Sequence, residues 1–340
     1  MRIVTLEEAF SFPPVRLANH GHPTEGMYDL LVRAGYWPAG DSFPPGINDI
    51  GNGRLADMDA AGVDYQVLSH TVPATEGLEP ELAVPLAAQV NDALGSAVAA
   101  HPDRFGAFAT LPVGDPKRAA AELDRAVTTL NLCGALINGH VNGRYLDDGY
   151  FWPIFEAAES LSVPVYIHPS RPPQQVMDTC YSGFTPLVNE ILGTGAWGWH
   201  VDTGLHALRL IIAGVFDRFP DLQIILGHMG ELLPSMMWRV EHTVGPLLNL
   251  SRPIGEYFSS NFHFTTSAFF DFAPFVAALH AIGTDRIMFS IDYPYSRQKD
   301  GVAFLNNLPI SLRDKHKIAH ENAERLLKVP PVVHAGNREE

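Results

Sequence analysis

Four ionisable side chains each follow a short apolar segment of the sequence. They are Glu7, His168, His228 and Asp292. Carboxylates and imidazoles are the groups that bind divalent metals and move protons in enzymes. One such residue would carry little information, but four of similar chemistry indicate a shared site. We therefore expect a metal centre with acid–base groups beside it.

Three of these residues are the expected metal ligands, and each has a structural alternative. Glu7 could be a helix cap or a surface carboxylate, although burying it beside an apolar strand without a cation would be costly. His168 precedes Pro169 and could be a hydrogen-bonded core histidine. Asp292 could cap a helix, and it is also a candidate proton donor. Metal binding by Glu7, His168 and Asp292 is the working hypothesis.

The segment around His228 indicates acid–base chemistry. We expect His228 to act as an acid or base or to bind substrate; a core histidine packed between glycines is the alternative. Glu231 follows three residues later and can orient the imidazole if a helix begins near Gly230. A carboxylate in the first turn of a helix would be favourable in any case.

Four further residues are candidates for substrate contact. Arg239 could hold a substrate carboxylate with two parallel hydrogen bonds, or it could simply pair with Glu241. Asn138 ends an expected strand and either lines the pocket or makes a structural hydrogen bond. Phe10 and Phe12 could form the walls for a flat substrate or fill the barrel end.

The elements that must position these residues follow from alternating apolar runs and helical patterns. The runs are rich in Val, Ile, Leu and Phe on successive positions, as expected for parallel strands buried on both faces. Eight strands with helices between them predict a closed (β/α)₈ TIM barrel of the α/β class, with functional residues at its C-terminal mouth. A doubly wound sheet is the alternative, but no Gly-x-Gly-x-x-Gly follows the first strand. The expected strands are Ile3–Leu6, Tyr65–Ser69, Phe105–Leu111, Ala135–Asn138, Val163–Ile167, Gln223–Gly227, Phe262–Thr266 and Arg286–Ile291.

Helices are expected where apolar residues recur every three or four positions. Two segments, Phe10–Gly53 and Pro169–Thr203, interrupt the pattern and are expected to be long loops over the mouth. The tail Pro330–Glu340 is expected to be solvated, and we expect one domain over residues 1–340. The expected helices are Arg54–Ala61, Ala83–Ala100, Lys117–Thr129, Tyr150–Leu161, Gly204–Phe219, Leu232–Leu248 and Phe272–Ile282.

Composition excludes several classes of protein. Among 340 residues, 38 are acidic and 23 are Lys or Arg, a formal charge of −15 that repels nucleic acid and anionic membranes. Two cysteines, Cys133 and Cys180, cannot build a disulfide framework. The amino-terminal segment lacks the apolar stretch of a signal peptide, and no apolar run reaches the roughly 18 residues of a membrane span. We expect a cytoplasmic protein with a small-molecule partner and no nucleic-acid or membrane partner.

Several segments resemble one family. The resemblance is to the metal-dependent decarboxylase branch of the amidohydrolase superfamily, and within it to the hydroxybenzoate decarboxylases of the γ-resorcylate, 2,3-dihydroxybenzoate, salicylate and 5-carboxyvanillate types. It runs from residue 1 to about residue 328. The segments that carry it are Leu6–Phe10, Asn91–Asp92, Pro102–Leu111, His168–Pro169, Gly214–Arg218, Ile225–Glu231, Trp238–Arg239 and Phe289–Pro294.

The resemblance implies roles for individual residues. Glu7, His168 and Asp292 would bind one metal, His228 and Glu231 would form a catalytic pair, and Arg239 would contact the substrate carboxylate. Many members carry a further ligand histidine where this chain has Ala9, and two-metal members carry a lysine where it has Asn138. One metal is therefore expected. The segment His168–Pro172 departs from the family's usual His-Pro-Arg-Asn-Pro, which affects substrate choice rather than metal chemistry. A homodimer or homotetramer is also implied.

The expected reaction is non-oxidative decarboxylation of an ortho-hydroxybenzoate to the phenol and CO₂, with Asp292 or His228 as proton donor. One imidazole and two carboxylates favour Mn²⁺ or Mg²⁺, with Zn²⁺ as an alternative, and no organic cofactor is needed. The rival interpretation is a hydrolase of the lactonase or amidase kind, in which the metal activates water. A non-enzymatic binding barrel would have no use for four converging ionisable groups.

Overall fold

A parallel β-barrel forms the centre of the computed structural model, which describes residues 1–35 and 44–330. Hydrogen bonds link β1, β2 and β3 in one sheet and β4 to β9 in another. Between β3 and β4, the Phe108 amide donates to the Leu68 carbonyl at 2.9 Å, and Leu6 bridges to Ser290 beyond β9. These contacts close the ring, with β3 and β4 as one interrupted strand, and confirm the barrel. The strands are β1 (Val4–Phe10), β2 (Tyr65–His70), β3 (Phe105–Ala107), β4 (Ala109–Thr110), β5 (Ala135–Asn138), β6 (Val165–His168), β7 (Ile224–Leu226), β8 (Phe262–Thr265) and β9 (Ile287–Met288).

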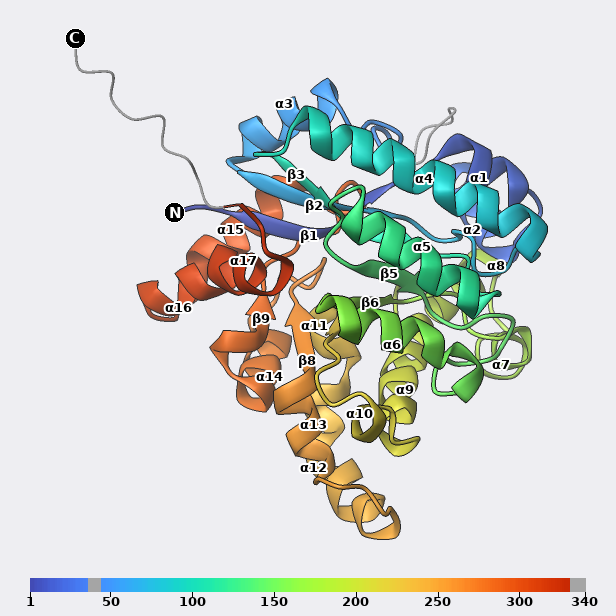
Figure 1. Ribbon diagram of the computed structural model, residues 1–340, viewed down its shortest axis with the longest axis vertical. Coiled ribbons are helices and arrows are strands. Elements are labelled where there is room, and N and C mark those ends of the chain that lie inside the picture. Colours follow the sequence, from blue (N-terminus) through green and yellow to red (C-terminus); the bar gives the residue numbers. More distant parts are fainter. Residues whose placement is uncertain (36–43, 331–340) are drawn as a thin grey trace.

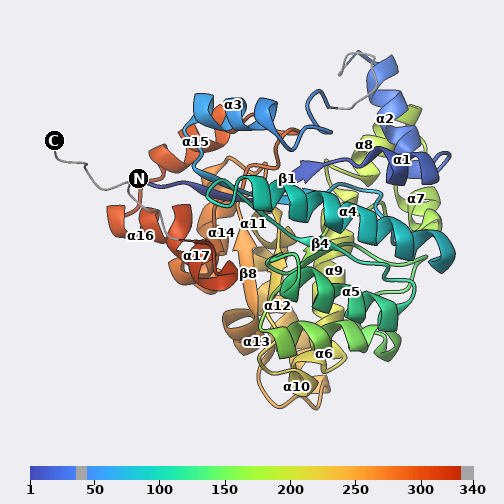
Figure 2. The same cartoon turned by 45° about the horizontal axis from the view of Figure 1, so that its top comes forward.

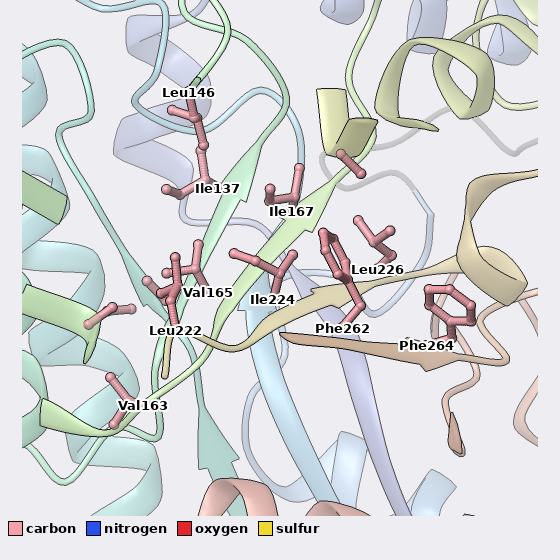
Figure 3. Packing of buried hydrophobic residues seen from close by; sticks show 14 of the residues in the cluster. Ile137, Leu146, Val163, Val165, Ile167, Leu222, Ile224, Leu226, Phe262 and Phe264 are labelled. Atoms are coloured by element: carbon pink, nitrogen blue, oxygen red, sulfur yellow. The ribbon is translucent and has the colours of Figure 1, made fainter. Parts of the chain in front are cut away.

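Strand residues alternate between two apolar clusters. In β7, Ile224 and Leu226 pack in the large cluster that also contains residues of the surrounding helices, whereas Ile225 belongs to a smaller cluster of inward-facing strand residues. Figure 3 shows Ile167, Ile224 and Leu226 side by side on neighbouring strands. Because successive strand residues point to opposite faces, both faces of the sheet are apolar. This explains the continuous apolar runs in the sequence.

Helices surround the barrel on its outside (Figures 1 and 2). Phe272–Ile282 is found as predicted, and α3, α4, α5 and α6 lie within a few residues of their predicted bounds. The helices are α1 (Pro13–Ala18), α2 (Pro23–Arg33), α3 (Asn52–Ala61), α4 (Pro80–Ala100), α5 (Pro116–Thr128), α6 (Trp152–Leu161), α7 (Gln174–Cys180), α8 (Pro186–Gly193), α9 (Gly198–Ile212), α10 (Val215–Arg218), α11 (His228–Glu231), α12 (Leu233–Thr243), α13 (Ile254–Asn261), α14 (Phe272–Ile282), α15 (Gln298–Asn307), α16 (Leu312–His316) and α17 (Asn322–Leu327). Short turns of other helix types are η1 (Gly149–Phe151), η2 (Gly245–Leu247), η3 (Thr284–Arg286) and η4 (Lys317–Glu321).

The two long connections over the mouth differ from the expected loops because they carry helices. The first holds α1 and α2, and its residues 36–43 lie outside the described part of the chain. The second holds α7, α8 and the start of α9. Pro13, Pro23 and Pro186 are each the first residue of a helix, where proline's missing N–H costs nothing. These prolines therefore begin helices within two segments that were expected to be loops.

The carboxyl-terminal third holds helices that were not predicted from the sequence, namely α13 and α15 to α17. Most of the expected tail, residues 331–340, lies outside the described part. Among the residues with assigned positions, no helix combines the length and the apolar character needed to cross a bilayer.

Candidate metal centre and active site

The ends of three barrel strands bring the predicted metal ligands together. Glu7 lies in β1, His168 ends β6, and Asp292 follows β9. One ligand atom from each lies within 4.8 Å of the others. Glu7 is buried, and the other two are half-buried at the base of a pocket. The arrangement is the one that strand-end residues of a closed barrel should give.

Hydrogen bonding shows that acceptor atoms face one another at this point. His168 Nδ1 lies 2.7 Å from the carbonyl oxygen of Pro169, which can only accept, so Nδ1 carries a proton and Nε2 of the neutral ring has a lone pair. That Nε2 lies 3.1 Å from Glu7 Oε1. Glu7 Oε1 is itself buried and has no hydrogen-bond donor within the described chain. With a neutral His168 ring, two lone pairs meet at this distance, and a proton or a metal ion between them removes their repulsion.

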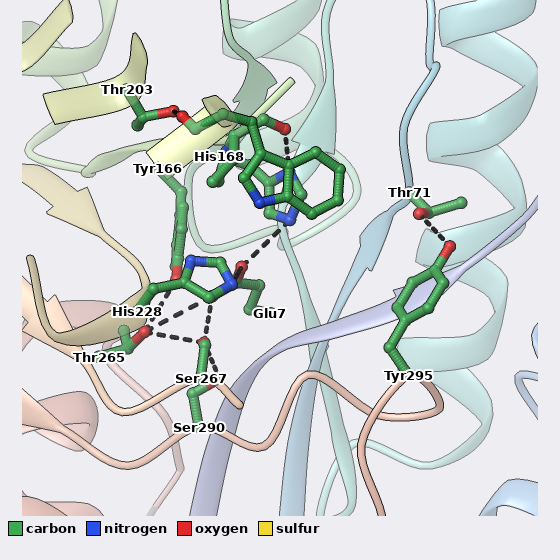
Figure 4. A network of polar contacts seen from close by, with 12 residues as sticks. Glu7, Thr71, Tyr166, His168, Thr203, His228, Thr265, Ser267, Ser290 and Tyr295 are labelled. Carbon is green, nitrogen blue, oxygen red and sulfur yellow. Dashed lines mark hydrogen bonds and ion pairs between the residues drawn. The ribbon is translucent and has the colours of Figure 1, made fainter. Parts of the chain in front are cut away.

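The second oxygen of Glu7 is held by hydroxyl groups. Tyr166 and Ser267 donate to Oε2, and Thr265 Oγ1 bonds to the Tyr166 hydroxyl at 2.9 Å (Figure 4). A Cβ atom on Gly227 would lie 2.9 Å from the same oxygen, so the chain approaches Glu7 as closely as glycine permits. These contacts fix the carboxylate so that Oε1 is directed toward His168 and His228, as ligand-orienting groups do in metal sites.

Electrostatics also favour a cation. Burial, and then the negative charge of Glu7, raise the pKa of Asp292 well above its ordinary value. Burial opposes ionisation of Glu7 too, but His228 and His168 lower its pKa to about 2. Two carboxylates this close are costly when both are ionised, and a divalent ion removes that cost. The donor set of two carboxylates and one imidazole nitrogen therefore fits a single divalent metal.

Glu231 connects two histidines beside the metal centre. Its Oε1 accepts from His228 Nδ1 and its Oε2 from His200 Nδ1, both at 2.7 Å. His228 Nε2 is thereby turned toward Glu7 Oε1, 3.8 Å away. Burial lowers the pKa of His228, but the charges of Glu231 and Glu7 outweigh it and raise that pKa to about 10. The proximity of Glu231 to His228 was predicted, and His200 was missed.

The backbone at the site is unusual. Glu7, His228, Glu231 and Asp292 have φ values of 62°, 49°, 53° and 67°, in the left-handed region that non-glycine residues seldom adopt. Each such residue costs free energy, and such residues cluster where function demands a particular side-chain direction. All four belong to the predicted site.

A cavity of about 210 Å³ opens above these residues. His168, His228 and Asp292 form its base, and Trp199, Tyr28 and Tyr295 supply aromatic surface. A larger hollow of about 700 Å³ between α1 and α2 contains no acid–base residue of the site. The smaller cavity is therefore the candidate substrate pocket. Its remaining lining residues are Met27, Leu31, Thr71, Val72, Ile191, Thr194 and Gly195.

None of the four predicted substrate-contact residues, Arg239, Asn138, Phe10 and Phe12, lines this pocket. Arg239 is exposed on α12. Phe10 is buried with its ring edge against His70, with the ring centroids 5.3 Å apart. Asn138 donates from Nδ2 to Glu76 at 3.1 Å and lines a separate cavity of about 90 Å³. The flat walls come instead from α2, from the segment after β9 and from Trp199.

Comparisons with known proteins agree with this geometry. The family model described as amidohydrolase matches residues 20–329. The γ-resorcylate decarboxylase of Rhizobium radiobacter is 37% identical over 339 residues, covering 96% of this chain and 98% of that protein. The crystal structure of 5-carboxyvanillate decarboxylase from Sphingomonas paucimobilis superposes with a TM-score of 0.86 at 36% identity, over 97% of this chain and 99% of that one. A dihydroxybenzoic acid decarboxylase from Polaromonas, with bound manganese and the inhibitor 2-nitroresorcinol, gives a TM-score of 0.84 at 34% identity, over 97% and 98% of the two chains.

Proposed function

Since the chain belongs to the amidohydrolase family, we propose that it is a metal-dependent carboxy-lyase that removes CO₂ from ortho-hydroxybenzoic acids. The relatives named above are hydroxybenzoate decarboxylases, and one of them carries manganese. The main support for the proposal is a feature of this chain. An oxygen of Glu7 that accepts no hydrogen bond within the described residues faces Nε2 of His168, and Asp292 lies nearby. His168 and Asp292 are at the base of a pocket lined by aromatic residues.

The proposed metal ligands are Glu7, His168 and Asp292, with one Mn²⁺ or Mg²⁺ per chain and Zn²⁺ as the alternative. When bound, the ion would hold a carboxylate and an ortho oxygen of the substrate and keep that oxygen as a phenolate. The β1 residue after Glu8 is Ala9, whose methyl group offers no fourth ligand. Three protein ligands leave room for two substrate oxygens.

The chain's own residues supply the proton. Asp292 or His228 delivers it to the ring carbon that bears the carboxylate. The bond from that carbon to the carboxylate then breaks, its electron pair returns to the ring, and CO₂ leaves. Glu231 holds His228 Nδ1, so that only Nε2 of His228 faces the pocket. A positioned acid of this kind contributes about 10²–10⁴-fold to the rate.

The pocket walls orient the ring and exclude water. The Trp199 indole lies beside His168, with the ring centroids 6.4 Å apart, and donates from Nε1 to His200. Tyr28 and Tyr295 are stacked on each other, with their ring planes 14° apart. Flat aromatic surfaces favour a flat substrate. We further propose that the chain forms one domain and acts in the cytoplasm as a homodimer or homotetramer. It would need no organic cofactor.

The test is CO₂ release from a panel of acids by the Mn²⁺-loaded enzyme. Salicylate, 2,3-dihydroxybenzoate and 2,6-dihydroxybenzoate should include substrates, whereas 4-hydroxybenzoate should be inert because its hydroxyl cannot reach the metal together with the carboxylate. High bicarbonate should drive slow carboxylation of the matching phenol. A hydrolase would instead cleave lactones or amides. Hydrolysis without CO₂ release, or equal turnover of ortho and para acids, would overturn the proposal.

A further inference from the structure

The side of the pocket away from the metal ligands is formed by a helical cap. Helix α2 supplies Met27, Tyr28 and Leu31, and α8 with the following turn supplies Ile191 and Thr194. Met27 and Leu31 are four residues apart and therefore share one face of α2. Figure 2 shows α2 and α8 together beyond the end of β1, over one side of the barrel.

Apolar side chains dominate this cap. Met27, Leu31 and Ile191 bring thioether and aliphatic groups into the pocket, with Val72 beside them. The charged residues that line the pocket, His168, His228 and Asp292, belong to the metal side. The cavity is therefore polar at its base and apolar at its cap.

The polar groups of the cap and walls already have partners. The Thr71 and Tyr295 hydroxyls are 2.7 Å apart, and Tyr295 lies 2.9 Å from Tyr28, which donates to the Val72 carbonyl at 3.1 Å (Figure 4 shows the Thr71–Tyr295 contact). Thr194 donates from Oγ1 to the Glu190 carbonyl. A chain of donation from Thr71 to Tyr295, from Tyr295 to Tyr28 and from Tyr28 to the Val72 carbonyl can use all three hydroxyl hydrogens within the protein. A ring hydroxyl that meets the aliphatic and thioether groups of the cap would lose its water without a hydrogen bond from those groups in exchange.

The direction of the substrate follows from the proposed function, on which this inference rests. If carboxylate C1 and hydroxyl C2 of the ring face the metal, carbons C4 and C5 point away from it, toward the cap. We propose that the substrate is an ortho-hydroxybenzoate with an apolar substituent, such as a methyl group, at C4 or C5. Leu31 and Ile191 are then the residues that determine this preference.

Methyl and hydroxyl groups are close in size, so two ligands that differ only in this group test the effect of polarity at nearly constant volume. Decarboxylation rates would mix binding with the electronic effect of the substituent. We therefore choose nitrophenols, in which a nitro group takes the place of the carboxylate and no CO₂ can leave. The pairs are 5-methyl- against 5-hydroxy-2-nitrophenol, for ring position C4, and 4-methyl- against 4-hydroxy-2-nitrophenol, for position C5.

The measurement is the dissociation constant of each ligand by calorimetry on the Mn²⁺-loaded enzyme. For at least one pair, the methyl ligand should bind about tenfold or more tightly than the hydroxyl ligand, the lower end of what one substituent contributes in an apolar pocket. Leu31→Asn, which keeps the size of the side chain, should reduce this ratio to near one. Ile191→Thr should also reduce the ratio, and this variant provides the test if Leu31→Asn does not fold. Leu312→Asn, at a position 69% exposed on α16, is the matched control and should keep the ratio.

Equal or tighter binding of both hydroxyl ligands by the wild type would overturn the inference. So would a ratio that neither pocket variant changes. Failure of the proposed function gives a different result: unsubstituted 2-nitrophenol would then show no metal-dependent binding, and salicylate would release no CO₂. If the protein shows metal-dependent binding and CO₂ release but no preference for the methyl ligands, the inference about the apolar substituent is wrong and the proposed function stands.

Discussion

His200 and His228 share one carboxylate. Their Nδ1 atoms lie 2.7 Å from the two oxygens of Glu231, and their ring centroids are 4.7 Å apart. Because a carboxylate oxygen only accepts, both imidazoles carry a proton on Nδ1. His228 therefore faces the metal centre through Nε2, whereas His200 turns its Nε2 toward the Trp199 indole N–H, 3.1 Å away. The pocket wall is thus connected to the acid–base residue through hydrogen bonds.

The first prediction separates a ligand from an acid. His168→Ala should lose the metal because it removes one of the three proposed ligands. His228→Asn should keep one metal per chain and lose about 10²-fold or more in turnover, the usual scale for an acid–base group. Metal content by mass spectrometry, measured beside kcat, checks both. The reverse pattern, with metal lost from the His228 variant and kept in the His168 variant, would mean that the roles are exchanged.

A second prediction concerns His200. His200→Ala leaves one Glu231 oxygen without its donor and should lower kcat by about 10- to 100-fold, as loss of a group behind an active residue typically does. His200→Asn places an amide N–H near the former Nδ1 and should recover most of that loss. Steady-state kinetics of both variants, with KM followed separately, are the check. If Asn is no better than Ala, the hydrogen bond to Glu231 is not what His200 contributes.

The third prediction uses the close approach of Gly227 to Glu7. A Cβ atom at Gly227 would lie 2.9 Å from Glu7 Oε2 and 3.2 Å from Oε1. Gly227→Ala should therefore displace the carboxylate and weaken metal binding by tenfold or more. The matched control is Gly26→Ala, where an added Cβ would meet nothing within 4 Å. Metal titration of the wild type, Gly227→Ala and Gly26→Ala measures the affinities. Equal affinities in all three would contradict the prediction.

The fourth prediction concerns stability in acid. His206 is fully buried, its Nε2 accepts from the Leu146 amide at 3.0 Å, and Nδ1 has no partner in the part of the chain that is described. Burial, aided by the charges of His140 and Arg209, lowers its pKa from 6.5 to about 3. Between these values the unfolded chain binds a proton that the folded chain does not. The contribution of neutral, buried His206 to the free energy of unfolding is therefore fully present above pH 6.5 and decreases as the pH drops toward 3.

The pH effect of His206 can be isolated by substitution. His206→Gln keeps an acceptor near Nε2 and cannot be protonated, so this variant should lose about 2 kcal/mol less than the wild type between pH 6.5 and pH 5. Urea unfolding of the metal-saturated proteins at both pH values measures the difference. His280→Gln, at an exposed position, should keep the wild-type dependence. Parallel losses in wild type and His206→Gln would show that this histidine is not the cause.

The barrel and the cluster of proposed metal ligands were accessible from the sequence for one physical reason. Strands buried on both faces must be apolar at every position, so an ionisable residue that follows such a run stands out. Glu7, His168 and Asp292 are of this kind, and the closed barrel brings their ligand atoms within 4.8 Å of one another. Glu231 was accessible because it is three residues from His228, and local backbone geometry determines that separation.

Other features of the site and its pocket were decided only by the tertiary structure. His200 is 28 residues before His228, and α9 brings it to Glu231 by packing so closely that a Cβ on Gly204 would lie 2.6 Å from the Glu231 carbonyl oxygen. No local pattern encodes that approach. Arg239 carries the right chemistry for a carboxylate, but α12 presents it to solvent. The apolar cap likewise joins Leu31 of α2 to Ile191 of α8, which are 160 residues apart and were both expected to lie in loops. Chemistry at strand ends can be read from residue type and order, whereas the shape of the pocket depends on contacts between segments that are remote in the chain.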